Sequence, residues 1–114
     1  MRLAVVILIA MIFQVWAQPL PKSLEPFLAK YCLDCHNEQS KKAGLNFEAL
    51  DWNISANSYY DWRRVFDQIE RGDMPPQKKS QPSKVERDKA VGLLLGPLIS
   101  HIKSSRNSQT VLRR

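Results

Sequence analysis

The sequence predicts a small all-α fold of three or four helices, and three observations support this prediction. The chain has 114 residues, which is enough for a single domain. In three segments the apolar residues recur three and four positions apart, which is the spacing of one helical face. No segment shows a convincing strand pattern, and the chain contains no internal repeat.

Residues 1–17 predict a secretory signal peptide. An apolar run from Leu3 to Phe13 follows one positive charge, and Val15 and Ala17 occupy the −3 and −1 positions of a cleavage site. The alternative is an uncleaved membrane anchor, but a span needs about 20 apolar residues and this run is shorter. We therefore expect cleavage after Ala17, export to the periplasm or an equivalent space, and a mature chain without a stable membrane span.

The charge balance does not lead us to expect a nucleic-acid partner. The chain has 17 Lys and Arg residues against 11 Asp and Glu residues, which gives a formal net charge of +6. Such a balance is compatible with nucleic-acid binding. However, an exported chain meets little nucleic acid, and the sequence contains neither a basic helix nor an RNA-binding signature.

The two cysteines of the chain carry its strongest motif. Cys32 and Cys35 are followed by His36 in the string C-L-D-C-H, which is the attachment signature of c-type haem. On a helical turn, residues three apart face the same side, so both thiols can form thioethers with the two vinyl groups of one haem. His36 would then bind the iron as the proximal ligand. The sequence thus predicts one covalently attached haem c, with the helices packed around it.

The cysteine pair has three other interpretations. A disulfide between cysteines three apart encloses almost no loop and stabilises little. A thioredoxin-like redox pair needs a βαβ unit, which the sequence does not indicate. A zinc site needs a second pair of ligands, but His101 is the only other histidine and no cysteine remains. The haem interpretation is favoured over all three.

Met74 is the predicted distal ligand of the iron. It lies in the string R-G-D-M-P-P, where Gly72 is a typical C′ residue at the end of a helix and two prolines stiffen the following loop. An unbranched thioether on a rigid turn suits an axial ligand, and Met opposite His raises the reduction potential of a haem. The rival ligand is His101, which would give a bis-His haem. Its place in a late helical stretch favours an ordinary, partly exposed surface histidine instead.

Two of the predicted helices lead into the ligand-bearing segments. The first begins with Ser23 as N-cap and runs directly into the cysteine motif, with one apolar face. The second spans about residues 58–71 and ends before Gly72. Residues 38–57 lie between the two helices, show no sustained period, and are expected to form a wrapping loop.

The third predicted helix begins with a capping box, in which Ser83 and Glu86 are three residues apart. Its apolar face extends as far as Ile102, and we expect Gly96–Pro97 to kink or break it. From Lys103 onward the sequence is polar, which favours a frayed tail.

Three strings together carry a resemblance to a known family: C-L-D-C-H, W-R-R-V-F-D-Q-I-E-R-G-D-M-P-P, and a final P-S-x-x-E-R. Over about residues 23–103 the chain resembles the planctomycete-type cytochrome c domain. The resemblance implies a small class I-like cytochrome c fold with a single covalent haem. It places the thioethers at Cys32 and Cys35, the proximal ligand at His36 and the distal ligand at Met74.

The resemblance also bears on the domain organisation. In this family the cytochrome domain usually opens a much longer exported protein. We expect a cytochrome c domain over residues 18–103, followed by a polar linker or tail over residues 104–114. One hypothesis is that the domain is the N-terminal electron-entry module of a larger protein that is truncated here. The other is a free-standing carrier with a polar tail.

The favoured function is one-electron transfer by haem iron that alternates between Fe2+ and Fe3+. No side chain is assigned as a catalytic acid, base or nucleophile, so the chain is predicted to be an electron carrier and not an enzyme. Redox proteins are the expected partners. The pairs Lys41–Lys42 and Lys78–Lys79 flank the ligand-bearing segments and would suit an acidic partner, although ordinary solubilising charge explains them as well.

Two other functions remain open. The first is a haem-based enzyme or gas sensor, in which the sixth ligand is absent or easily displaced. The second is an interaction module without haem, held by a disulfide between Cys32 and Cys35. The absorption spectrum distinguishes a haem enzyme or gas sensor from an electron carrier. The intact mass distinguishes a module without haem from a protein that holds haem covalently.

Overall fold

The structure is a computed structural model that describes residues 18–112, with the side chains of residues 19–107, and the predicted signal peptide at 1–17 lies outside this part. The described chain is mostly helical, as predicted. Its elements are, in order, the strand β1 (Gln18–Pro19), the 3-10 turn η1 (Lys22–Leu24), the helix α2 (Glu25–Tyr31), the 3-10 turn η2 (Lys42–Gly44), the strand β2 (Asn53–Ile54), and the helices α3 (Tyr59–Arg71) and α4 (Lys84–Leu112).

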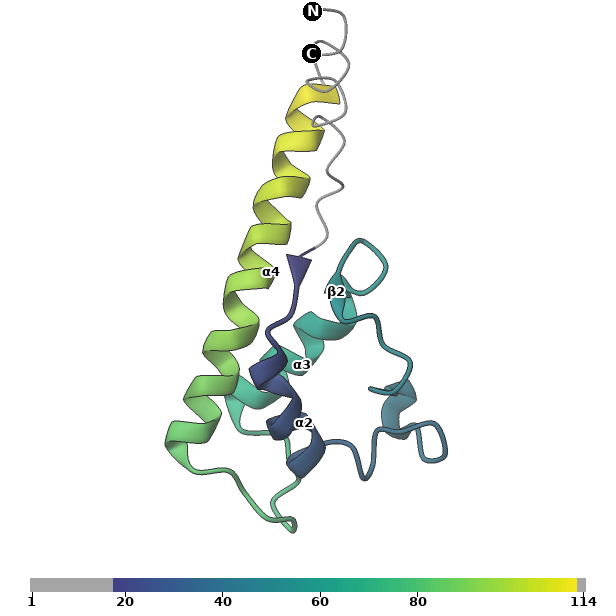
Figure 1. Ribbon diagram of the computed structural model, residues 1–114, viewed down its shortest axis with the longest axis vertical. Helices are drawn as coiled ribbons and strands as arrows, with labels where there is room; N and C mark the ends of the chain where they lie inside the picture. The colour runs from purple at the N-terminus through teal and green to yellow at the C-terminus, as the bar shows by residue number, and fades with distance from the viewer. Residues whose placement is uncertain (1–17, 113–114) are drawn as a thin grey trace, which may run out of the picture.

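The long helix α4 forms one side of the molecule, and the shorter helices α2 and α3 lie beside its N-terminal half (Figure 1). The segment between α2 and α3 projects away from α4 on the opposite side. Strand β1 pairs with β2 in an antiparallel ladder of two residues each, which ties the start of the described chain to this segment. These two strands were not expected from the sequence, because a two-residue strand has no detectable period.

The hydrophobic core joins all three helices, Ile54 of β2, and Leu20, which directly follows β1. Trp62 of α3 is fully buried, and its indole Nε1 donates a hydrogen bond to the carbonyl of Asp51 at 2.7 Å. Trp52 donates in the same way to the carbonyl of Leu20 at 2.8 Å. Both indoles thereby fasten the irregular segment before α3 onto the core. The other buried apolar residues of this core are Leu20, Leu24, Leu28, Ile54, Val65, Ile69, Ala90, Leu94 and Leu98.

Helix α2 begins later than expected. The prediction of Ser23 as its N-cap is wrong, because η1 precedes the helix and Leu24 occupies the N-cap position without a side-chain hydrogen bond. Pro26 lies in the first turn of α2, where a proline costs little because the backbone N–H that it lacks would have no helical partner. The Tyr31 hydroxyl, at the end of α2, donates to Glu86 of α4 at 2.7 Å and lowers the pKa of that carboxyl.

The predicted bounds of α3 are confirmed to within one residue. Ser58 is the N-cap residue of the helix, and its buried hydroxyl donates to the carbonyl of Asn53 at 2.6 Å. Gly72 ends the helix in the left-handed conformation with φ 78°, as the sequence predicted. A glycine adopts this conformation without the steric cost that a Cβ would impose.

Helix α4 begins at the predicted capping box but extends further than predicted. The backbone N–H of Glu86 donates to the Ser83 hydroxyl at 3.1 Å, and the N–H of Ser83 donates to the Glu86 carboxylate at 3.3 Å. Of the two expected outcomes at Gly96–Pro97, a break is wrong, because Pro97 lies inside a helix that continues to Leu112, and a kink stays a prediction. The polar stretch after Lys103 is therefore helical over most of its length. None of the described helices combines the length and the apolar character that crossing a membrane requires.

Candidate functional site

A cavity of about 840 Å³ opens beside α3, between the segment that follows α2 and the loop that follows α3. The sequence predicted four site residues, and all four line this cavity: Cys32, Cys35, His36 and Met74. They come from two segments that are separated along the chain by the whole of α3. The fold therefore brings the residues of the C-L-D-C-H motif and Met74 to one cavity.

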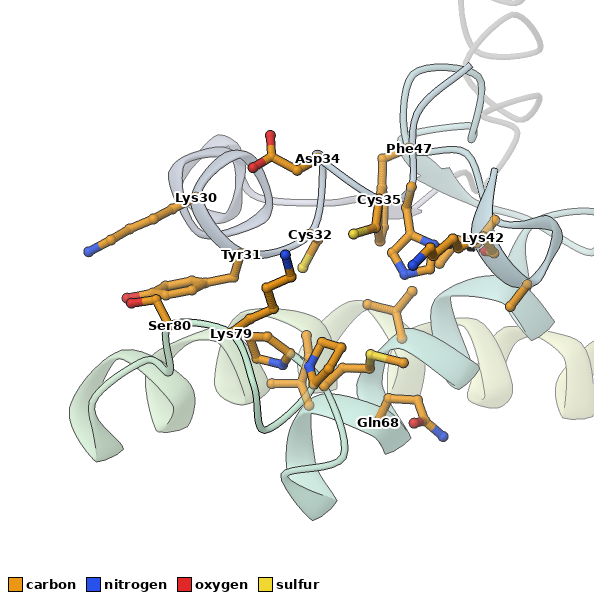
Figure 2. A pocket seen from close by; sticks show the side chains of 18 of the residues that line it. Lys30, Tyr31, Cys32, Asp34, Cys35, Lys42, Phe47, Gln68, Lys79 and Ser80 are labelled. Carbon is orange, nitrogen blue, oxygen red and sulfur yellow. Dashed lines mark hydrogen bonds between the residues drawn. The ribbon is translucent and has the colours of Figure 1, made fainter. Parts of the chain in front are cut away.

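The two thiols lie on one turn that continues directly from α2. The backbone N–H groups of Cys35 and His36 both donate to the carbonyl of Cys32, at 3.3 and 3.1 Å. This turn directs both cysteine sulfurs into the cavity, while the carboxylate of Asp34 points away from it (Figure 2). Both thiols are free in the structure. The i,i+3 spacing has thus placed two reactive groups on one side of the chain, as expected.

Burial shapes the chemistry of one thiol. Burial and, to a smaller extent, repulsion from Cys35 raise the pKa of the Cys32 thiol to about 12. A thiol with so high a pKa is protonated at neutral pH. It therefore has little tendency to react as a free thiolate or to hold a metal ion directly.

The ring of His36 is held by a backbone carbonyl. Its Nδ1 lies 2.9 Å from the carbonyl oxygen of Lys42, and because a carbonyl can only accept, Nδ1 must carry the proton. In the neutral ring this leaves Nε2 as the unprotonated nitrogen that can bind a metal. The ring of Phe47 packs edge-on against the imidazole at a centroid distance of 5.9 Å. The protein therefore sets the orientation and the tautomer of the His36 ring, as a metal-binding histidine requires.

The loop after His36 folds back to supply that carbonyl. The backbone N–H of Lys42 donates to the carbonyl of Cys35 at 3.1 Å, and the N–H of Phe47 donates to the carbonyl of His36 at 2.9 Å. Lys41 and Ala43 adopt positive φ angles of 40° and 56° in this reversal. Nothing in the sequence indicates this contact, because it depends on a backbone oxygen and on a turn without a glycine at those two positions.

Met74 follows immediately after the end of α3. The backbone N–H groups of Asp73 and Met74 both donate to the carbonyl of Gln68, at 3.0 and 3.2 Å. These bonds hold the backbone of Met74 against the C-terminal turn of α3. The next residue, Pro75, is buried and also lines the cavity. Met74 itself is half-buried, which leaves its side chain at the cavity wall.

The remaining lining divides into an apolar wall and a charged rim. Val65 and Ile69 of α3 and Leu45 and Phe47 of the loop supply apolar surface. Five cations also line the cavity: Lys30, Lys42, Arg64, Lys78 and Lys79. An apolar cavity with a few directed polar groups is typical of a cofactor site, and its volume falls within the usual range of about 300–1,000 Å³ for such sites.

His101 does not lie at this cavity. Its ring stacks on Tyr59 with a centroid distance of 5.0 Å and an interplanar angle of 26°. Together with Tyr60 it lines a different, smaller cavity of about 330 Å³. The structure therefore brings Met74, and not His101, to the cavity that the two cysteines face.

The donor set fits a covalently bound haem. Two free thiols, one imidazole with an available Nε2, and one thioether line the same cavity. These are the groups that two thioether bonds and two axial ligands require. Within residues 18–112, no three His, Cys, Asp or Glu side chains gather into a group that could hold a metal ion by themselves.

Comparison with known proteins agrees with the resemblance seen in the sequence. Residues 32–78 match the family model described as Planctomycete cytochrome C. The matched stretch begins at the first cysteine and contains every residue predicted for the site. No curated protein and no solved structure matches the chain.

Proposed function

We propose, from the planctomycete-type cytochrome c domain that residues 32–78 match, that this protein is an exported electron carrier with one covalently bound haem c. Cys32 and Cys35 would form the thioether bonds, His36 would be the proximal iron ligand and Met74 the distal one. When bound, the haem iron supplies a one-electron change between Fe2+ and Fe3+. One observation carries the proposal, namely that these four residues line a single cavity of about 840 Å³.

The side chains around the cavity would contribute to haem binding in different ways. Two covalent bonds from one turn would retain the cofactor in an open compartment. The hydrogen bond from Nδ1 of His36 to the carbonyl of Lys42 orients the imidazole and increases the basicity of Nε2. Val65 and Ile69 offer apolar surface that excludes water from the interior of the site. None of these groups needs to exchange a proton, which suits an electron carrier better than an enzyme.

The position of Met74 supports a six-coordinate iron. A thioether raises the reduction potential of a haem relative to a second imidazole, and it blocks the coordination position that an enzyme or gas sensor keeps open. His101 is engaged with Tyr59 at a different cavity. The sixth ligand is therefore assigned to Met74.

Paired substitutions test the ligand assignment. The protein is produced with a haem-attachment system, and Met74→Ala is compared with His101→Ala as the matched control. The parent should be low-spin, show the far-red Met–iron charge-transfer band and ignore carbon monoxide. Met74→Ala should lose that band, bind carbon monoxide and have a lower potential, while His101→Ala should behave as the parent.

Two outcomes would contradict the proposal. If Met74→Ala keeps the far-red band, Met74 is not the ligand, and loss of low-spin character in His101→Ala would assign that role to His101. Ready binding of carbon monoxide by the parent protein would instead favour the gas sensor or haem enzyme over the carrier.

We also propose that the redox partner presents an acidic surface to the rim of the cavity. Lys42, Lys78 and Lys79 line the cavity and are exposed, and no ion pair engages them within the described residues. The other two rim cations are paired, Lys30 with Glu86 at 3.9 Å and Arg64 with Asp61 at 3.5 Å. Unpaired cations beside the exposed edge of a redox centre attract an acidic surface and increase the rate of encounter.

Charged redox reagents test this second proposal. Lys78→Gln/Lys79→Gln is compared with Lys22→Gln/Lys89→Gln, which removes the same charge from exposed sites that do not line the cavity. At low ionic strength the rim variant should react severalfold more slowly than the control variant with anionic hexacyanoferrate. With cationic hexaammineruthenium this deficit should disappear. Equal rates for the two variants with the anionic reagent would show that the lysines serve solubility alone.

A further inference from the structure

The loop that carries Met74 has no regular secondary structure of its own. It connects α3 to α4 over residues 72–83. A side chain on a flexible loop would lose much conformational entropy on binding iron, so a strong ligand needs a loop that is held in advance. The N–H of Met74 is bonded to Gln68 at the end of α3, which fixes only one side of the residue.

Arg87 of α4 holds the other side. Its Nη1 donates to the carbonyl of Met74 at 3.0 Å and to the carbonyl of Ile69, near the end of α3, at 2.8 Å. Its Nη2 donates to the Oε1 of Gln81 at 3.2 Å. One guanidinium thus connects α4, the end of α3, and both halves of the loop.

Gln81 extends the same network through the loop. Its Nε2 donates to the carbonyls of Pro75, Pro76 and Lys79, at 3.1, 2.9 and 3.2 Å. The amide nitrogen has two hydrogens, so two of these three carbonyls share one of them, while the amide oxygen accepts from Arg87. Side chains from α4 and the loop therefore bond to five backbone carbonyls in the stretch from Ile69 to Lys79.

We propose that Arg87, with Gln81, is a positioning residue that holds the backbone of Met74 at the edge of the cavity so that its thioether remains on the iron. This inference rests on the proposed function, in which Met74 is the distal ligand. Arg87 acts through Met74 and does not line the cavity itself. The planar guanidinium suits the task, because its fixed fork reaches several acceptors at once, whereas a lysine ammonium is a single point charge.

The experiment uses the haem-loaded protein and compares Arg87→Gln with Arg63→Gln as the matched control. Arg63 lies on the exposed part of α3 and pairs with Asp67 at 3.4 Å, away from the Met74 loop. In Arg87→Gln the far-red Met–iron band should weaken, and the apparent affinity of the ferrous protein for carbon monoxide should rise about tenfold. That factor corresponds to about 1.4 kcal/mol, within the cost of losing charge-assisted hydrogen bonds. Arg63→Gln should match the parent protein.

A double variant separates positioning from a general structural role. In the Met74→Ala background, Arg87→Gln should have no further effect on carbon monoxide affinity, because the ligand through which it acts is gone. An equal effect in both backgrounds would overturn the inference. A far-red band of parental strength in Arg87→Lys would also overturn the inference, since a positive charge alone would then be enough to keep Met74 on the iron.

The failures of the two proposals can be distinguished. If Met74→Ala itself changes nothing, the ligand assignment is wrong and this inference falls with it. If Met74→Ala opens the iron to carbon monoxide but Arg87→Gln does not, only the positioning role is wrong. Should Arg87→Gln not fold, Gln81→Ala is decisive, because Gln81 is exposed and its loss should shift the band and the affinity in the same direction by a smaller factor.

Discussion

Helix α3 takes part in two regions that are packed in different ways. The first is the core between α3 and α4, where Trp62 and Leu94 are both 0% exposed and protein side chains fill the space. The second is the cavity, where Val65 and Ile69 form part of the wall and two irregular segments form the rest. Side chains of the protein fill the core between α3 and α4, whereas the cavity is an apolar space that suits a bound cofactor.

The largest expected effect comes from removing both attachment points. In Cys32→Ala/Cys35→Ala we expect helicity to be lost in both regions, because Val65 and Ile69 belong to the core and to the cavity wall. A domain of this size buries too little apolar surface to tolerate such a gap. Circular dichroism and hydrogen exchange of the exported product measure the effect. Persistent protection of α3 and α4 would show that the two regions are independent.

The next effect is confined to the core between α3 and α4. Leu94→Ala should lower the free energy of unfolding of the haem-loaded protein by about 3 kcal/mol, since it leaves a cavity at a fully buried site. The neighbouring Leu95 is 42% exposed, so Leu95→Ala serves as control and should cost less than about 1 kcal/mol. Denaturant titration measures both changes. The far-red Met–iron band should stay unchanged, because Leu94 does not line the cavity. A shift of that band in Leu94→Ala would show that packing between α3 and α4 also positions Met74.

A smaller effect is confined to the loop side. Gly72→Ala should cost about 1 kcal/mol, because the site has φ 78° and a Cβ there would meet no atom within 4 Å, so only the backbone is strained. Gly92 lies inside α4 with equally open space, so Gly92→Ala should instead stabilise the protein by about 0.5–1 kcal/mol. Thermal unfolding of the two variants gives the signs. The same sign for both would show that α3 does not end at Gly72 in the way described.

The predictability of the two regions also differs. The bounds of α3 could be predicted from its apolar stripe and from Gly72, because both features are local. Packing of the apolar face in the core favours the same helix. Gly96–Pro97 does not break α4, because buried Leu94 and Leu98 on either side hold the helix in the core and outweigh the lost hydrogen bond of Pro97.

In the candidate site, the sequence nominated the side chains but not the groups that position them. The cysteine motif and the turn around Met74 are recognisable because their chemistry depends on residue types at fixed spacing. The carbonyl of Lys42 is a backbone group, and any residue there could supply it. Arg87 of α4 donates to the carbonyl of Met74 in the loop after α3, 13 residues earlier in the chain, and nothing in the local sequence indicates that contact.

Every part of the proposed site depends on Cys32 and Cys35 holding one haem covalently. The most direct measurement is the intact mass of the exported chain, produced with a haem-attachment system, together with its pyridine haemochrome spectrum. We expect a mass greater than that of the bare chain by one haem, and a spectrum typical of two thioether bonds. A mass equal to that of the bare chain, or two hydrogens below it as for a Cys32–Cys35 disulfide, would show that no haem is attached.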